Sequence, residues 1–117
     1  MTYTVRELFL EDDSSPYAAW FNRLPPDIAA KITVAKLRMQ QGNLSRVEWF
    51  RGIGEYKIDV GPGYRIYFGR DGLTIIVLLG GGQKRGQQAD IDRAVSLWEN
   101  YKKRKKQISS SSMRRRK

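Results

Sequence analysis

Residues 55–68 read EYKIDVGPGYRIYF, two short runs in which apolar and polar residues alternate on either side of Gly61-Pro62-Gly63. Strict alternation is typical of half-buried strands, and a glycine- and proline-rich break between two such runs is typical of a β-hairpin. We expect a three-residue loop, Gly61 to Gly63, to set the register of the pair. The apolar residues that would then face one another in the core are Val60 and Tyr64, Ile58 and Ile66, and Tyr56 and Phe68.

The opposite face of this hairpin carries the side chains of chemical interest. In the expected register Asp59 faces Arg65, and Lys57 faces Tyr67. This face would be one rigid surface that carries three side chains able to contact a phosphate: Lys57, Arg65 and Tyr67. A solvated sheet face, with an Asp59–Arg65 ion pair contributing ~0.2–1 kcal/mol, explains the same pattern. Alternation alone leaves both interpretations open.

The residues before the hairpin predict one strand and two helices. Residues 2–10 alternate well enough for a strand. Ser15 followed by Pro16 is typical of a helix N-cap and first turn, and Pro25-Pro26 ends that helix. A second helix then runs from Pro26 to a C-cap at Gly42. Its buried stripe is expected to be Ile28, Ile32, Ala35 and Met39.

The residues after position 42 predict the rest of the fold. Residues 43–54 are expected to connect the helices to three strands, at residues 55–60, 64–69 and 73–79, with Arg70-Asp71-Gly72 as a tight turn. A final helix begins at Ala89. The prediction is an α+β fold, a small, mainly antiparallel sheet of about four strands with an N-terminal helical hairpin and a C-terminal helix, and with helices on one side. Residues 1–106 would form a single domain, and 107–117 a disordered basic tail.

Composition excludes several kinds of chemistry. The 117 residues include no cysteine and no histidine, so thiolate zinc sites and Ser-His or Cys-His catalysis are excluded. No metal or other cofactor is expected. The net charge is +10, but residues 102–117 hold 9 of the 22 basic residues and no acidic residue. No signal peptide or transmembrane run is evident, so a cytoplasmic location is expected.

The glycine-rich stretch GGGQKRGQQ, residues 80–88, follows the most apolar strand and precedes a helix, a context in which backbone N–H groups bind anions. It lacks the spacing of a Walker A loop. Lys84 and Arg85 would lie on this flexible connector, one strand away from the hairpin. A solvated turn is the alternative interpretation.

Residues 50–95, FRGIGEYKIDVGPGYRIYFGRDGLTIIVLLGGGQKRGQQADIDRAV, closely resemble the RelE/ParE toxin superfamily, nearest the HigB-like addiction module killer proteins. The resemblance extends over roughly residues 6–101, and GYRIYF, LLGGGxKxxQ and ADIDRA are its most specific parts. It implies the toxin of a type II toxin–antitoxin pair, an endoribonuclease that cleaves mRNA on the ribosome. A helix-turn-helix, HigA-like antitoxin is the implied partner, forming an oligomer with the toxin.

The resemblance also implies roles for residues. Arg65 matches the arginine that binds the scissile phosphate, while Lys57 and Lys84 match basic positions of the site. Tyr67 completes the set of predicted catalytic residues, either as a donor to the leaving oxygen or by stacking on a base. A lysine crowded by other cations would have a lowered pKa and could transfer a proton. The residues expected to bind RNA are Arg85, Gln88, Lys102, Lys103 and Arg104.

Two rival functions remain open at this stage. The first is inhibition of DNA gyrase by binding, as in ParE-like members of the superfamily. It stays open because the chain has no histidine to match the catalytic residue that some ribonuclease members place near the C-terminus. The second is a nucleic-acid- or protein-binding module without catalysis. A neighbouring helix-turn-helix reading frame would favour a toxin over such a module.

Overall fold

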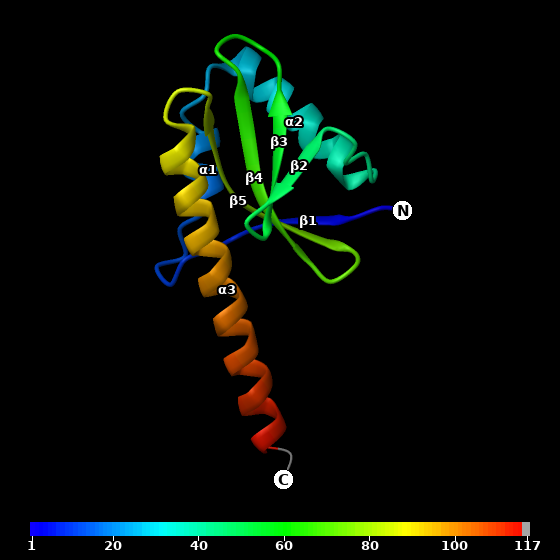
Figure 1. Ribbon diagram of the computed structural model, residues 1–117, viewed down its shortest axis with the longest axis vertical. Coiled ribbons are helices and arrows are strands. Elements are labelled where there is room, and N and C mark those ends of the chain that lie inside the picture. Colours follow the sequence, from blue (N-terminus) through cyan, green and yellow to red (C-terminus); the bar gives the residue numbers. More distant parts are fainter. Residues whose placement is uncertain (116–117) are drawn as a thin grey trace.

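A five-stranded mixed sheet forms the centre of the computed structural model, which describes the backbone of residues 1–115 and the side chains of residues 1–108 (Figure 1). The sheet order is β1-β5-β4-β3-β2, and only the β1–β5 pair is parallel. The strands are β1 (Thr4–Glu7), β2 (Val47–Phe50), β3 (Ile53–Ile58), β4 (Tyr64–Asp71) and β5 (Ile75–Gln83). The helices are α1 (Pro16–Phe21), α2 (Pro26–Gln40) and α3 (Gln87–Arg115).

The structure confirms the α+β class but corrects the number of strands. Residues 43–54 were expected to be a connection, whereas β2 lies there and pairs antiparallel with β3. The two strands are joined by Arg51 and Gly52, whose φ angles are 51° and 83°. Two consecutive positive φ values suit the right-handed twist of a tight hairpin. Arginine is an uncommon residue there, so the turn is hard to recognise from sequence.

The predicted start of α1 at Pro16 and the predicted position of α2 are confirmed, but α1 ends at Phe21, before Pro25-Pro26. Ser15 caps α1, because its Oγ accepts a hydrogen bond of 3.1 Å from the Ala18 N–H. In α2 the expected stripe is buried, and Gly42 follows the helix with φ of 87°. The members of that stripe are Ile28, Ile32, Ala35 and Met39.

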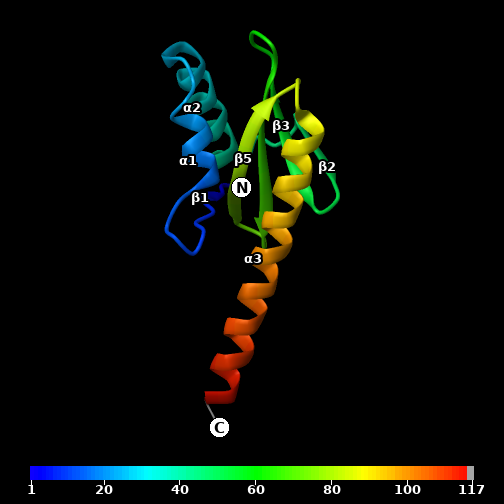
Figure 2. The same ribbon diagram turned by 90° about the vertical axis from the view of Figure 1, so that its left-hand side faces the viewer.

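Helices cover both faces of the sheet, which corrects the prediction that they lie on one side. Figure 2 shows α1 and α2 on one face and α3 on the other. The first core joins α1 and α2 to Tyr56, Ile66 and Phe68. The second core lies under α3, whose Trp98 packs so closely on Gly69 that a Cβ there would stand 2.4 Å from the indole ring. Both faces of the central parts of β4 and β5, residues 66–69 and 76–79, are therefore removed from water.

The central hairpin has a different register from the one expected. Lys57 pairs with Arg65 and Glu55 pairs with Tyr67, a shift of two residues that leaves Asp59 in the loop. The loop closes through a hydrogen bond of 3.0 Å from the Gly63 N–H to the Val60 carbonyl. Alternation was satisfied by both registers, since a shift of two residues keeps every side chain on its own face.

The glycine stretch belongs to β5, although it was expected to be irregular. A bulge at Leu79 shifts the alternation, so that Gly80 and Gly82 face α3 while Gly81 faces α1. Trp20 of α1 packs on Gly81, and the Asp90 carboxylate of α3 stands over Gly82. The absence of side chains thus lets α1 and α3 approach the two faces of one strand.

The far half of α3 extends beyond the sheet (Figure 1). Asp71, at the β4–β5 turn, accepts hydrogen bonds of 2.6 Å from Tyr101 and 2.5 Å from Lys105. The expected disordered tail began at residue 107, whereas α3 continues to Arg115, and residues 116–117 lie outside the described part of the chain. Within residues 1–115, no helix has the length and apolar character needed to cross a membrane.

Candidate functional site

The centre of the candidate site is a guanidinium held over a buried carboxylate. Arg65 on β4 and Glu55 on β3 both face α3, and the Arg65 Nε lies 3.7 Å from the Glu55 Oε2. Glu55 is 1% exposed and Arg65 is 11% exposed. Among the described side chains, the enclosed Nε and Nη1 of Arg65 have no hydrogen-bond partner. The ion pair orients the guanidinium, and only the 11% of the Arg65 side chain that stays exposed is open to a ligand.

The first turn of α3 completes this buried polar cluster. Gln87 Nε2 donates a hydrogen bond of 2.9 Å to Glu55 Oε2, which ties the start of α3 to β3. Asp90 follows one turn later, above Gly82, the residue that pairs with Arg65. Tyr67 is 1% exposed, and within residues 1–108 its buried hydroxyl has no hydrogen-bond partner. Burial, followed by the charge of Glu55, raises the pKa of Tyr67.

Three of the predicted catalytic residues gather at the open end of this cluster. Lys57 is the cross-strand neighbour of Arg65. A Cβ placed on Gly63 would lie 3.7 Å from Arg65 Nη1 and 3.9 Å from Lys84 Cβ, so Arg65 and Lys84 approach the same point. The Lys84 N–H also donates to the Gly63 carbonyl, at 3.1 Å. Tyr67 does not share the open surface, because α3 covers it.

Lys57 is a fixed cation in this arrangement. Its Nζ lies 2.7 Å from Glu48 Oε1 on β2, and this hydrogen bond raises the pKa of Lys57 above its usual value. A lowered pKa was expected because of the neighbouring cations. Sequence reasoning missed the effect of Glu48, since β2 itself was not predicted. Lys57 therefore supplies positive charge rather than a general base.

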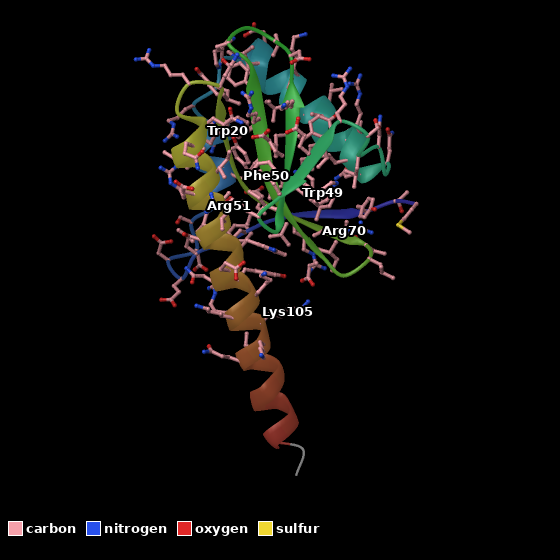
Figure 3. All side chains as sticks on the ribbon, in the orientation of Figure 1. Trp20, Trp49, Phe50, Arg51, Arg70 and Lys105 are labelled. Carbon is pink, nitrogen blue, oxygen red and sulfur yellow. The ribbon has the colours of Figure 1, made fainter. Side chains whose placement is uncertain are left out.

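The residues predicted to bind RNA do not form one surface. Arg85 and Gln88 are exposed beside the site, where α3 begins. Lys102 lies 15 residues after Gln87, which is ~22 Å along the helix axis at ~1.5 Å per residue. It is paired with Glu99 at 3.1 Å, and Lys103 and Arg104 follow it. Figure 3 shows Lys105, the next residue, on the part of α3 below the sheet.

The comparisons with known proteins place the chain in a family. An uncharacterized protein of Haemophilus influenzae is 36% identical to it over 83 residues, which cover 69% of this chain and 84% of that protein. The chain belongs to the same family as that protein. No family model matches the chain, and no solved structure matches it. Membership of the RelE/ParE superfamily remains a prediction.

Because the Haemophilus relative is uncharacterized, the function has to be argued from the side chains of this chain. Sequence reasoning missed three of those in the cluster: Glu55, Gln87 and Asp90. Glu55 alternates with the apolar Tyr56 and Ile58, so the pattern predicts a solvated position on the opposite face of the strand. Its burial depends on α3 lying over β3. Within residues 1–108, no group of three acidic side chains has the arrangement of a metal site.

The pH dependence of stability should reveal the burial of Asp90. Desolvation raises the pKa of Asp90, while Arg93, 3.7 Å away, acts in the opposite direction. Between the ordinary and the raised pKa the folded state binds more protons, so stability falls as pH rises through that window. Asp90→Asn removes this loss. We expect the variant to gain stability over the wild type between about pH 3 and about pH 7 in urea unfolding.

Asp92 is the matched control for this measurement. Its carboxylate accepts hydrogen bonds from Arg51 and Gln88, which lower the pKa of Asp92. The wild type therefore gains stability from Asp92 above its ordinary pKa, and this gain is lost as the pH falls. Asp92→Asn should therefore be less stable than the wild type over the same pH range, whereas Asp90→Asn should be more stable. The same sign for both variants would contradict the assignment of Asp90 as a carboxyl destabilised by burial.

Proposed function

We propose that this protein is a metal-independent endoribonuclease that cleaves mRNA, and that it is the toxin of a type II toxin–antitoxin pair. One observation carries the proposal: the Arg65 guanidinium is oriented by Glu55 and remains 11% exposed at the open end of the sheet, beside Lys57 and Lys84. A guanidinium among further cations is a typical binding partner of a phosphate group. The sequence resemblance to the RelE/ParE superfamily supports the same ligand.

The reaction needs no group outside the chain. The RNA 2′-oxygen attacks the adjacent phosphorus, the bond from phosphorus to the 5′-oxygen breaks, and a cyclic phosphate and a 5′-hydroxyl result. Arg65 stabilises the charge that builds on the non-bridging oxygens, which makes its contact stronger in the transition state. Lys57, held as an ammonium by Glu48, adds positive charge.

Two proton transfers accompany these bond changes. In this proposal the Asp90 carboxylate accepts the proton of the 2′-hydroxyl, and the exposed ammonium of Lys84 protonates the departing 5′-oxygen. Asp90 lies over the strand partner of Arg65 and remains 21% exposed. Tyr67 was predicted as the leaving-group donor. Because Tyr67 is buried, we place it beneath the cluster and do not assign it the role of leaving-group donor.

The test is induction in cells of the wild type, Arg65→Ala and Arg70→Ala, followed by mapping of mRNA 5′ ends. Arg70 is an exposed arginine on the same strand that stacks on Tyr3, so it is the matched control. We expect growth arrest and mRNA cleavage with the wild type and Arg70→Ala. Cleavage by Arg65→Ala should be slower by about 10²–10³-fold, the usual loss of one transition-state donor. Circular dichroism of purified Arg65→Ala checks that the variant folds.

Other outcomes would overturn the proposal. Growth arrest with intact mRNA and trapped gyrase–DNA breaks would favour a ParE-like inhibitor. The absence of arrest would contradict both forms of toxin. A helix-turn-helix reading frame beside this one is the expected source of the antitoxin, and co-expression of its product should restore growth.

A further inference from the structure

A cavity of about 350 Å³ opens beside the Arg65 cluster, between α1 and α3 and along the edge of β5. This volume falls within the ~300–1,000 Å³ range of small-molecule sites. Trp20 and Leu24 line it on the α1 side, and Asp90 and Ala94 line it on the α3 side. Tyr67, whose buried hydroxyl is unpartnered within the described side chains, also lines it. Figure 3 shows Trp20 level with the first half of α3.

The floor of the cavity is bare backbone. Within residues 1–115, β1 pairs with β5 only along Ile75–Leu78. Two further hydrogen bonds flank this pairing, from the Thr4 N–H to the Thr74 carbonyl and from the Leu8 N–H to the Leu78 carbonyl. The next part of β5, Gly80–Gln83, has β4 on one side and the cavity on the other. A Cβ on Gly80 would meet no atom within 4 Å. A flat ligand can therefore approach the peptide groups of this edge closely.

The rim of the cavity is positively charged. Arg23, Arg85 and Arg93 line it, and all three are exposed. Arg93 is paired with Asp90 at 3.7 Å, while no ion pair of Arg23 or Arg85 is recorded among residues 1–108. Three arginines with only one carboxylate favour an anionic ligand. A guanidinium can donate two parallel hydrogen bonds to two oxygens of one phosphate, so a phosphate group suits this rim.

The floor, walls and rim match the parts of a nucleotide. Unpaired peptide groups can hydrogen-bond the edge of a base, aromatic side chains contact its face, and arginines bind its phosphate. Gly82 joins this cavity to the Arg65 site, because it lines the cavity and pairs with Arg65 on the neighbouring strand. We propose that the cavity is a second subsite that binds one ribonucleotide of the RNA next to the phosphate on Arg65. In taking RNA as the source of that nucleotide, the inference rests on the proposed ribonuclease function.

The three tryptophans make the binding measurable by NMR titration of the ¹⁵N-labelled full chain. Ligands are the four ribonucleoside 5′-monophosphates, inorganic phosphate and a trinucleotide protected from cleavage by 2′-O-methyl groups. We expect the indole N–H of Trp20 and the amides of residues 80–83 to shift with nucleotides. The indoles of Trp49, on β2, and Trp98, on the second core, should not shift. The trinucleotide should bind at least about tenfold more tightly than any monophosphate.

Two double variants distinguish the contribution of the rim arginines from the effect of the protein's overall positive charge. Arg23→Ala with Arg93→Ala should weaken nucleotide binding at least about tenfold, as expected when guanidinium contacts to phosphate are removed. Arg38→Ala with Arg46→Ala, exposed positions outside the cavity lining, is the control and should leave binding unchanged. Circular dichroism of both double variants checks their folding.

The alternative outcomes each overturn a defined part of the inference. Equal effects of inorganic phosphate and nucleotides would show an anion site without recognition of the base. A monophosphate that binds as tightly as the trinucleotide would indicate a free nucleotide as the ligand in place of RNA. Active cleavage without any shift at Trp20 would reject the subsite and leave the proposed function standing. Nucleotide binding at Trp20 by a protein without ribonuclease activity would reject the proposed function and leave the nucleotide site standing.

Discussion

Glu55→Gln is expected to lower the free energy of unfolding by about 3–5 kcal/mol, the usual result of removing one partner of a buried ion pair. Glu55 is 1% exposed, and Arg65 depends on it for charge compensation. Glutamine has the shape of glutamate and can still form a hydrogen bond with Gln87. The fall in the free energy of unfolding therefore measures the effect of the missing charge. Urea unfolding of the purified chain measures it.

Two further variants make this measurement specific. Glu48→Gln removes the exposed partner of Lys57, and a surface pair of this kind contributes little to stability. In the double variant Glu55→Gln with Arg65→Met, the guanidinium that lost its partner is gone. We therefore expect most of the stability to return, although RNA cleavage should be as slow as in Arg65→Ala. A Glu55→Gln protein as stable as the wild type would contradict a buried Arg65–Glu55 pair.

Trp98→Ala is expected to destabilise the protein by about 3–5 kcal/mol, as large-to-small changes in a core do. Trp98 is 5% exposed, packs on Gly69 and stacks on Tyr101 with ring centroids 5.0 Å apart. Because Gly69 has no side chain, little in the sheet can move into the space left by the indole. The second core, which holds α3 over the sheet, would lose its largest contact.

Trp49→Ala is the control for Trp98→Ala. Trp49 is 48% exposed and makes an edge contact with Phe68, so we expect a loss below about 1.5 kcal/mol. Hydrogen exchange should show faster exchange of the amides of α3 in Trp98→Ala than in Trp49→Ala. Equal stability losses in the two variants would contradict the covering of the second face by α3.

Local patterns were sufficient for much of the fold. Ser15 with Pro16 marked the start of α1, and the stripe of α2 was predicted residue by residue. Both depend on contacts between residues a few positions apart, which leave a direct mark in the sequence. β2 was missed because Val47–Phe50 is short and its turn contains Arg51 with a positive φ. Such a turn is stabilised by the strands on both sides of it and not by its own residues.

The candidate site was predicted in part. Arg65, Lys57 and Lys84 were selected from the sequence, and the structure brings them to one end of the sheet. The partners were predicted wrongly, since Arg65 lies opposite Lys57 and forms its ion pair with Glu55, not with Asp59. Alternation determines which face a strand residue occupies, but registers two residues apart satisfy it equally well.

The sequence by itself determined the face on which each residue of the central hairpin lies, and therefore which side chains could form a site. Only the tertiary structure decided their environment. By lying across β3 and β4, α3 buries Glu55 and Tyr67 and leaves Arg65 at the opening. The burial of a strand residue depends on an element that packs over it from more than 30 residues away in sequence. The energy of a charge depends on that burial, so the chemistry of Arg65 is set by the fold as a whole.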